Sequence, residues 1–98
     1  MGSTILITGA TDGIGLAAAE QLAAGGRRLL LHGRNPAKLA AADRAVRAAG
    51  ADSGSVVETF VADLSRLDEV EAFAAEVLER CDHLDVLINN AGVLRTSE

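Results

Sequence analysis

A glycine-rich turn near the start of the chain constrains its fold more than any other feature. Residues 8–15 read TGATDGIG, and they join the apolar run Thr4–Thr8 to a stretch in which Ile14, Ala18 and Leu22 recur at helical spacing. A passage from a buried strand into a helix needs glycine where the chain turns tightly and where the helix packs on the sheet. The segment therefore predicts a strand, a glycine turn and a helix in succession.

Apolar runs of strand length alternate with helical patterns along the rest of the chain. The expected strands are Thr4–Thr8, Arg28–His32, Val56–Ala62 and Asp85–Asn89, and the expected helices span 14–24, 36 to about 49, and a third stretch that follows Ser65 and reaches Cys81. Such alternation forms a parallel sheet with right-handed crossovers. We therefore expect one α/β domain over residues 1–98, a Rossmann-type doubly wound parallel sheet truncated to about four strands (order 3-2-1-4) and three helices.

Local signals predict how two of these helices begin and which faces they bury. Asn35-Pro36 is typical of an N-cap followed by proline at the first helical position, and Ser65 with Asp68 fits a capping box. The expected inner faces are Leu39, Ala42, Val46 and Ala49 in one helix, and Leu67, Val70, Phe73, Ala74, Val77 and Cys81 in the other. The fourth strand would be an apolar sheet edge, so we expect a portion of a longer protein.

The glycine turn lies where doubly wound folds bind nucleotides. Glycine lets backbone N–H groups approach phosphate at the start of the following helix. A phosphate-transfer loop, GxxxxGK followed by Ser or Thr, is excluded because Lys38 is the only lysine. Two interpretations remain: a dinucleotide site, or a loop that only turns the chain.

The end of the second strand predicts which dinucleotide is bound. NAD sites place an acidic residue there and NADP sites an arginine, and the sequence reads His32-Gly33-Arg34-Asn35 with no carboxylate before Asp43. Arg34 therefore favours NADP over NAD, because its forked donors match a 2′-phosphate. Alternatively, Arg34 is a solvated loop residue. The missing acid also disfavours a methyltransferase that uses S-adenosylmethionine, and Asp12 either adds negative charge near the phosphates or caps the first helix.

Three motifs in the expected order resemble the short-chain dehydrogenase/reductase family. They are TGATDGIG at 8–15, Asp63-Leu64 after the third strand and NNAG at 89–92 after the fourth. The resemblance implies a hydride-transferring oxidoreductase that uses NADP(H), with a small-molecule carbonyl or alcohol as substrate, and a homo-oligomer at full length. The resemblance also implies that this chain is the NAD(P)-binding portion of such an enzyme.

The resemblance assigns cofactor contacts to particular residues. The turn would line the pyrophosphate and ribose, Asp63 and Leu64 would meet the adenine, and Asn90, Ala91 and Gly92 would approach the adenosine ribose, with Asn89 as scaffold. The full set of expected cofactor-binding residues is Gly9, Thr11, Asp12, Gly13, Ile14, Gly15, Arg34, Asn35, Asp63, Leu64, Asn90, Ala91 and Gly92. In the alternative interpretation, Asp63 only ends a strand and the asparagines form a turn.

The family's proton-transfer residues have no counterparts here. That mechanism uses a Tyr, a Lys four residues later and an upstream Ser, whereas this chain contains no tyrosine. We therefore expect no catalytic residue among the 98, although the resemblance implies an enzyme. The alternative is a dinucleotide-binding module without catalytic activity, or a structural module.

Composition excludes several other classes. The net charge is −5 and the basic residues are scattered, which disfavours nucleic-acid binding. A single cysteine, Cys81, suits a reducing compartment, and no targeting or membrane-spanning segment is evident, so a cytoplasmic protein is expected. No metal site is expected, and His32 and His83 receive no role.

Overall fold

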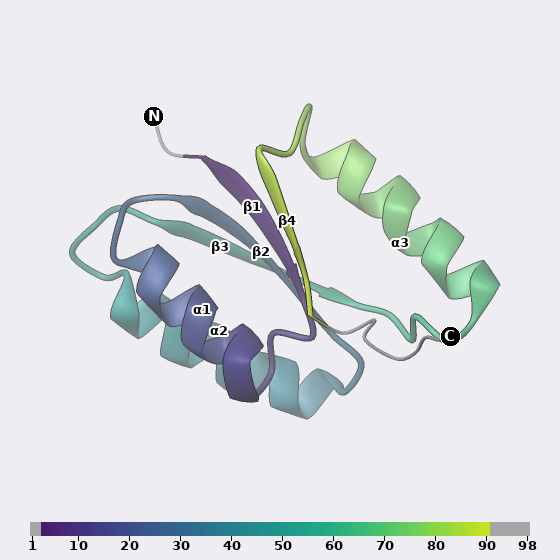
Figure 1. The fold of residues 1–98 in the computed structure, drawn as a ribbon, viewed down its shortest axis with the longest axis horizontal. Helices are drawn as coiled ribbons and strands as arrows, with labels where there is room; N and C mark the ends of the chain where they lie inside the picture. The colour runs from purple at the N-terminus through teal and green to yellow at the C-terminus, as the bar shows by residue number, and fades with distance from the viewer. Residues whose placement is uncertain (1–2, 91–98) are drawn as a thin grey trace.

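The computed structural model describes residues 3–90, which form four strands and three helices (Figure 1). In chain order these are β1 (Thr4–Thr8), α1 (Gly13–Ala23), β2 (Arg28–Gly33), α2 (Pro36–Ala49), β3 (Val56–Val61), α3 (Leu67–Arg80) and β4 (Val86–Asn89). Each expected element is present within one or two residues of its predicted bounds. The strict alternation confirms the α/β class.

All four strands are parallel, and their order across the sheet is β3-β2-β1-β4. This order confirms the predicted Rossmann-type arrangement. The first two crossovers move outward from β1 on one side, and the third returns to its other side. The winding direction therefore reverses between β1 and β4, and this reversal creates a switch point at the carboxyl ends of the two strands.

Alternating side chains divide the core into two layers, one on each face of the sheet. Ile5, Ile7, Leu29 and Leu31 belong to the cluster that includes residues of α1 and α2. Leu6, Leu30 and Phe60 pack with Phe73, Val77 and Cys81 on the other face. Figure 1 shows this arrangement, with α1 and α2 on one side of the sheet and α3 alone on the other.

The predicted start of α2 is confirmed and that of α3 is wrong. The Asn35 side chain accepts hydrogen bonds from the N–H groups of Ala37 and Lys38, at 2.9 and 3.1 Å, and caps α2. The Ser65 hydroxyl instead donates to the Asp63 carboxylate at 2.7 Å, and the N-cap residue of α3 is Arg66. The turn centred on Asp63 occupies the hydroxyl that a capping box would need.

The predicted inner faces of the helices are only partly confirmed. Leu39, Ala42 and Val46 are buried on α2, and Phe73 and Val77 on α3. Ala49, Ala74 and Leu67 are exposed, and Val70 is half-buried. On α1 the buried residues are Gly15, Ala19 and Ala23, whereas Ile14 is 81% exposed. The small residues of α1 face the sheet because they let the helix approach it closely.

The β4 edge carries apolar side chains that residues 3–90 leave exposed, as predicted. Leu87 is 56% exposed, and Leu78 of α3 is 76% exposed. Between them a groove of about 420 Å³ opens beside α3. Its lining is mainly apolar and comprises Leu6, Thr8, Val70, Phe73, Ala74, Val77, Leu78, Leu84, Leu87 and Asn89.

No helix within the described range has the length and hydropathy needed to cross a membrane. The longest helices, α2 and α3, have 14 residues each, whereas a transmembrane helix needs about 20.

The layered core predicts unequal effects of two identical substitutions. Leu30 is 0% exposed and Leu67 is 73% exposed, so Leu30→Ala should lower the free energy of unfolding by about 2–5 kcal/mol. Leu67→Ala should change it by less than about 0.5 kcal/mol. Urea denaturation followed by circular dichroism measures both. Equal losses would contradict the placement of Leu30 in the core.

Candidate functional site

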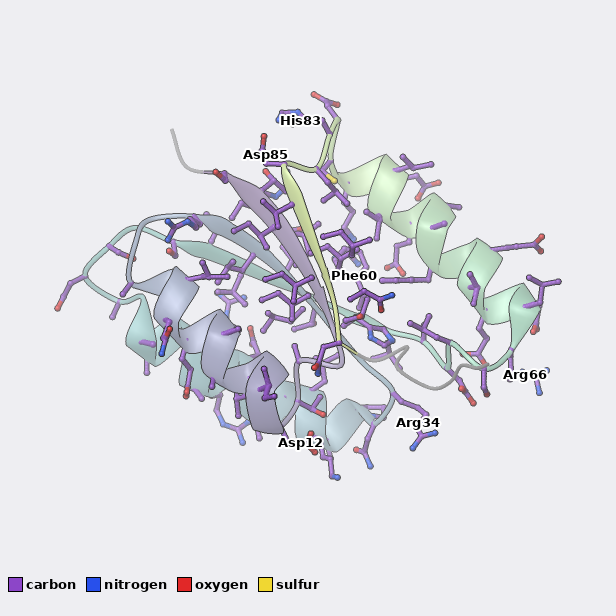
Figure 2. The ribbon with its side chains drawn as sticks, viewed as in Figure 1. Asp12, Arg34, Phe60, Arg66, His83 and Asp85 are labelled. Carbon is purple, nitrogen blue, oxygen red and sulfur yellow. The ribbon has the colours of Figure 1, made fainter. Side chains whose placement is uncertain are left out.

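The candidate site lies at the carboxyl ends of the strands, around the turn from β1 into α1. Most of the predicted residues follow the ends of β1, β2, β3 and β4, and parallel strands bring those ends to one edge of the sheet. Asp12 and Arg34 both lie at this end of the molecule in Figure 2. The described part of the predicted set is therefore gathered along one edge.

The glycine turn adopts a conformation that only glycine accepts without strain. Gly9 and Gly13 have φ values of 65° and 58°, in the left-handed region that disfavours residues with a Cβ. Gly15 is required for a different reason: a Cβ there would lie 2.3 Å from the carbonyl oxygen of Gly9 and 2.8 Å from Nδ2 of Asn90. The turn is therefore compact, with the first turn of α1 against Gly9.

Side chains from the two neighbouring strands hydrogen-bond to the backbone of Gly9. The Gly9 N–H donates to Nδ1 of His32 at 3.1 Å, and its carbonyl oxygen accepts from Nδ2 of Asn90 at 3.0 Å. The next N–H, that of Ala10, donates to the backbone carbonyl of His32 at 2.9 Å. These bonds fix the start of the turn between β2 and β4.

Thr8 completes the link between β1 and β4 at the switch point. Its hydroxyl lies 3.1 Å from Oδ1 of Asn89 and accepts the Asn90 N–H at 3.0 Å. Asn89 therefore contacts the end of β1, and Asn90 also supports the turn through the Gly9 carbonyl. Both asparagines thus hold the edge together.

The N-terminus of α1 has no side-chain cap. Asp12 occupies the N-cap position but makes no capping hydrogen bond, and its carboxylate instead lies 3.8 Å from Nζ of Lys38. The first N–H groups of a helix lack intrahelical partners, and together with the helix dipole they favour a bound anion. Ile14, in this first turn, is exposed beside them.

The end of β2 places three further predicted residues near the turn. Arg34 is exposed, and Thr11 packs over Gly33, where an added Cβ would lie 2.5 Å from Cγ2 of Thr11. The Asn35 carboxamide oxygen accepts the two capping hydrogen bonds of α2. Arg34 is thus the charged residue of the loop after β2, and it is exposed to solvent beside the glycine turn.

After β3, Asp63 is held by its own loop. Its Oδ1 accepts hydrogen bonds from the hydroxyl and the N–H of Ser65, at 2.7 and 3.0 Å, and its N–H donates to Glu69 at 2.7 Å. The Ser65 hydrogen bonds lower the pKa of Asp63 below its ordinary value of 3.8, and the Arg34 and Arg66 charges add to this. Leu64 packs against the core layer beneath α3.

Ala91 and Gly92 lie outside the described residues. Over 3–90 no group of three His, Cys, Asp or Glu side chains is arranged to hold a metal ion. His83 lies 3.6 Å from Asp85, and both are far from Asp12 and Arg34 in Figure 2.

His32 is the residue of this edge that sequence reasoning missed. It is buried, and besides Gly9 it contacts the carbonyl oxygen of Ala62 at 2.9 Å through Nε2. The available signal was its position at the end of a buried strand, directly before the Gly33-Arg34 pair. A histidine there faces the turns that follow both neighbouring strands.

A parallel sheet in the order β3-β2-β1-β4, with a glycine turn and an uncapped helix N-terminus at its switch point, defines a Rossmann-type nucleotide-binding fold. A family model for short chain dehydrogenases matches residues 3–98. The chain therefore belongs to the short-chain dehydrogenase/reductase family, as its motifs indicated.

Two curated relatives show the extent of the similarity. The chain is 38% identical to human retinol dehydrogenase 13 over 94 residues, which are 96% of this chain and 28% of that protein. It is 41% identical to the short-chain dehydrogenase anuI of Penicillium roqueforti over 95 residues, which are 96% of this chain and 36% of that protein. The chain thus spans about a third of the length of these relatives.

Solved structures show the same fold with both nicotinamide dinucleotides. A metagenomic short-chain oxidoreductase in complex with NADP has a TM-score of 0.80 and 42% identity, covering 93% of this chain and 39% of that one. An NADH-dependent reductase, A1-R′, complexed with NAD has a TM-score of 0.76 and 40% identity, and the match covers 95% of this chain and 37% of that one.

The packing at Gly15 predicts a steric penalty for a single methyl group. Gly15→Ala should destabilise the protein by about 1–3 kcal/mol, because the backbone of Gly9 must move. Gly25→Ala is the matched control, since its Cβ would meet only the flexible end of Arg27. Urea denaturation of both variants checks this. A Gly15→Ala variant as stable as the control would contradict the close approach.

The loop around Asp63 predicts a measurable titration shift. Ser65→Ala removes the hydroxyl that contributes most to lowering the pKa of Asp63, so that pKa should rise toward 3.8. NMR titration of the Asp63 carboxyl carbon measures the change, with substitution of the exposed Ser3 by alanine (Ser3→Ala) as a control. An unchanged pKa would show that the hydroxyl does not stabilise the carboxylate.

Proposed function

We propose that this chain is the NADP(H)-binding portion of an oxidoreductase that transfers hydride between NADP(H) and a small carbonyl or alcohol substrate. The observation that carries the proposal is the uncapped N-terminus of α1 behind the glycine turn, with Arg34 at the neighbouring strand end. For the whole protein, the proposal includes a cytoplasmic location and a homo-oligomer, as the sequence suggested.

The residues present fit a dinucleotide. Gly9, Gly13 and Gly15 keep side chains away from the start of α1, so a pyrophosphate can approach the N–H groups of its first turn. The exposed Ile14 and the half-buried Thr11 would border the pyrophosphate and ribose. Asp63 and Leu64 would meet the adenine at the end of β3.

Three features favour NADP over NAD. Arg34 supplies a fixed positive charge at the end of β2, where NAD sites place a carboxylate. Lys38 lies near Asp12 and offsets part of its negative charge. The Asp63 carboxylate is held by Ser65 in its own loop. A 2′-phosphate beside Arg34 would therefore meet a cation and no competing acid from the same loop.

The chemistry that the dinucleotide supplies when bound is the exchange of a hydride at its nicotinamide ring. This chain's residues bind the adenosine half, orient it through the fixed turn and hold the phosphates at the N-terminus of α1. Among the 98 residues there is no tyrosine, so the proposed role of these residues is cofactor binding and not proton transfer.

Arg34→Ala tests the cofactor assignment. A charge-assisted hydrogen bond contributes about 1.5–3 kcal/mol, so the variant should bind NADPH about 10- to 150-fold more weakly, with little change for NADH. Fluorescence enhancement of the bound nicotinamide measures both affinities, and the absence of Trp and Tyr keeps the protein background low.

Arg44→Ala is the matched control, because Arg44 is an exposed arginine on α2 away from the strand ends. It should bind both dinucleotides as the unchanged protein does. Equal losses for NADPH and NADH in Arg34→Ala would refute the 2′-phosphate assignment. A folded wild-type chain that binds neither dinucleotide would favour a structural module instead.

A further inference from the structure

The imidazole of His32 joins three segments at the candidate site. It is 3% exposed, and its two nitrogens contact the turn after β1, at the Gly9 N–H, and the residue after β3, at the Ala62 carbonyl. Its ring also packs against Phe73 of α3, with 5.1 Å between ring centroids. Few rotamers satisfy these contacts together, so the ring is fixed in place.

The two partners determine the tautomer. The Gly9 N–H is only a donor, so Nδ1 must be the unprotonated acceptor, and the Ala62 carbonyl is only an acceptor, so Nε2 must carry the proton. The neutral Nε2–H form satisfies both. A protonated ring would direct a second donor at the Gly9 N–H, and that hydrogen bond would be lost.

We propose that neutral His32 is a positioning residue for dinucleotide binding, because it links the phosphate-binding turn at Gly9 to the adenine-side loop at Ala62. This inference rests on the proposed function. The Gly9 N–H donates to the His32 side chain on β2, and the backbone carbonyl of His32 accepts the next N–H along. His32 thereby holds the start of the turn in the conformation that leaves the first turn of α1 open to an anion.

The link depends on pH in a defined direction. Burial lowers the pKa of His32 below its ordinary value of 6.5, and the Ala62 hydrogen bond partly opposes this. The charged groups on the surrounding segments are Asp12, Arg34, Asp63 and Glu69, and within residues 3–90 none of them pairs with the ring. The hydrogen bond to Gly9 is therefore complete above pH 6.5 and is lost as pH falls through the lowered pKa.

Two variants of similar polarity separate the two hydrogen bonds. In His32→Asn the side-chain oxygen lies near the position of Nδ1 and can accept the Gly9 N–H, but the Ala62 bond is lost. In His32→Gln the amide N–H lies near Nε2 and can donate to Ala62, but the Gly9 bond is lost. His32→Leu removes both bonds and keeps the site apolar.

The variants are compared in the full chain by NADPH titration, urea denaturation and hydrogen exchange at the Gly9 amide. His32→Asn should bind NADPH within about threefold of wild type, and His32→Gln and His32→Leu should bind about tenfold or more weakly, because the partly buried Gly9 N–H loses its partner. Without ligand, the Gly9 amide hydrogen should exchange rapidly only in His32→Gln and His32→Leu. Wild-type affinity should decline relative to that of His32→Asn as pH falls through the lowered pKa of His32.

The positioning role would be overturned if His32→Asn and His32→Gln lost equal affinity for NADPH and the losses followed the loss of global stability. Slow hydrogen exchange at the Gly9 amide in every variant would also overturn it. NMR assignment of the Nδ1–H tautomer in the wild type would overturn it as well. A wild-type chain that binds no dinucleotide refutes the proposed function and the role of His32 in binding. In that event the exchange pattern still shows whether His32 fixes the turn.

Discussion

The hydrogen bonds that two side chains make with the Gly9 backbone are the interaction on which the site depends. The N–H and the carbonyl of Gly9 lie just beyond the end of β1 and are partly buried, and backbone groups shielded from water are costly without partners. His32 of β2 satisfies the first group and Asn90, after β4, satisfies the second. The turn is therefore held on both sides by residues at the ends of β2 and β4, and these contacts position the start of α1.

Charge at this edge is distributed in a way that suits an anionic ligand. Each acidic side chain near the turn has a partner within the protein: Asp12 lies near Lys38, and Asp63 is held by Ser65. Arg34 is exposed beside them. The uncapped N-terminus of α1 adds the positive end of a helix dipole. The strand ends thus carry an exposed arginine and a helix N-terminus in a protein whose net charge is −5.

The parts of the structure that local sequence signals encode were predictable. Apolar runs such as Thr4–Thr8, the Asn35 cap and the alternation of elements depend on neighbours within a few residues, and the strand order followed from that alternation and the known order of doubly wound folds. The inner face of α1 was not predicted, because close packing at Gly15 turns Ile14 outward. The role of His32 was not predictable either, since its partners lie 23 and 30 positions away in sequence.

The unequal sequence distances of the two Gly9 contacts have a consequence for synthesis of the chain. His32 is 23 residues from Gly9, whereas Asn90 is 81 residues away, and contacts between distant residues cost more loop-closure entropy and form later. A chain that emerges from the ribosome can pair the Gly9 N–H once β2 has formed. Its carbonyl must wait for β4, so a strand that appears much later completes the turn that follows β1.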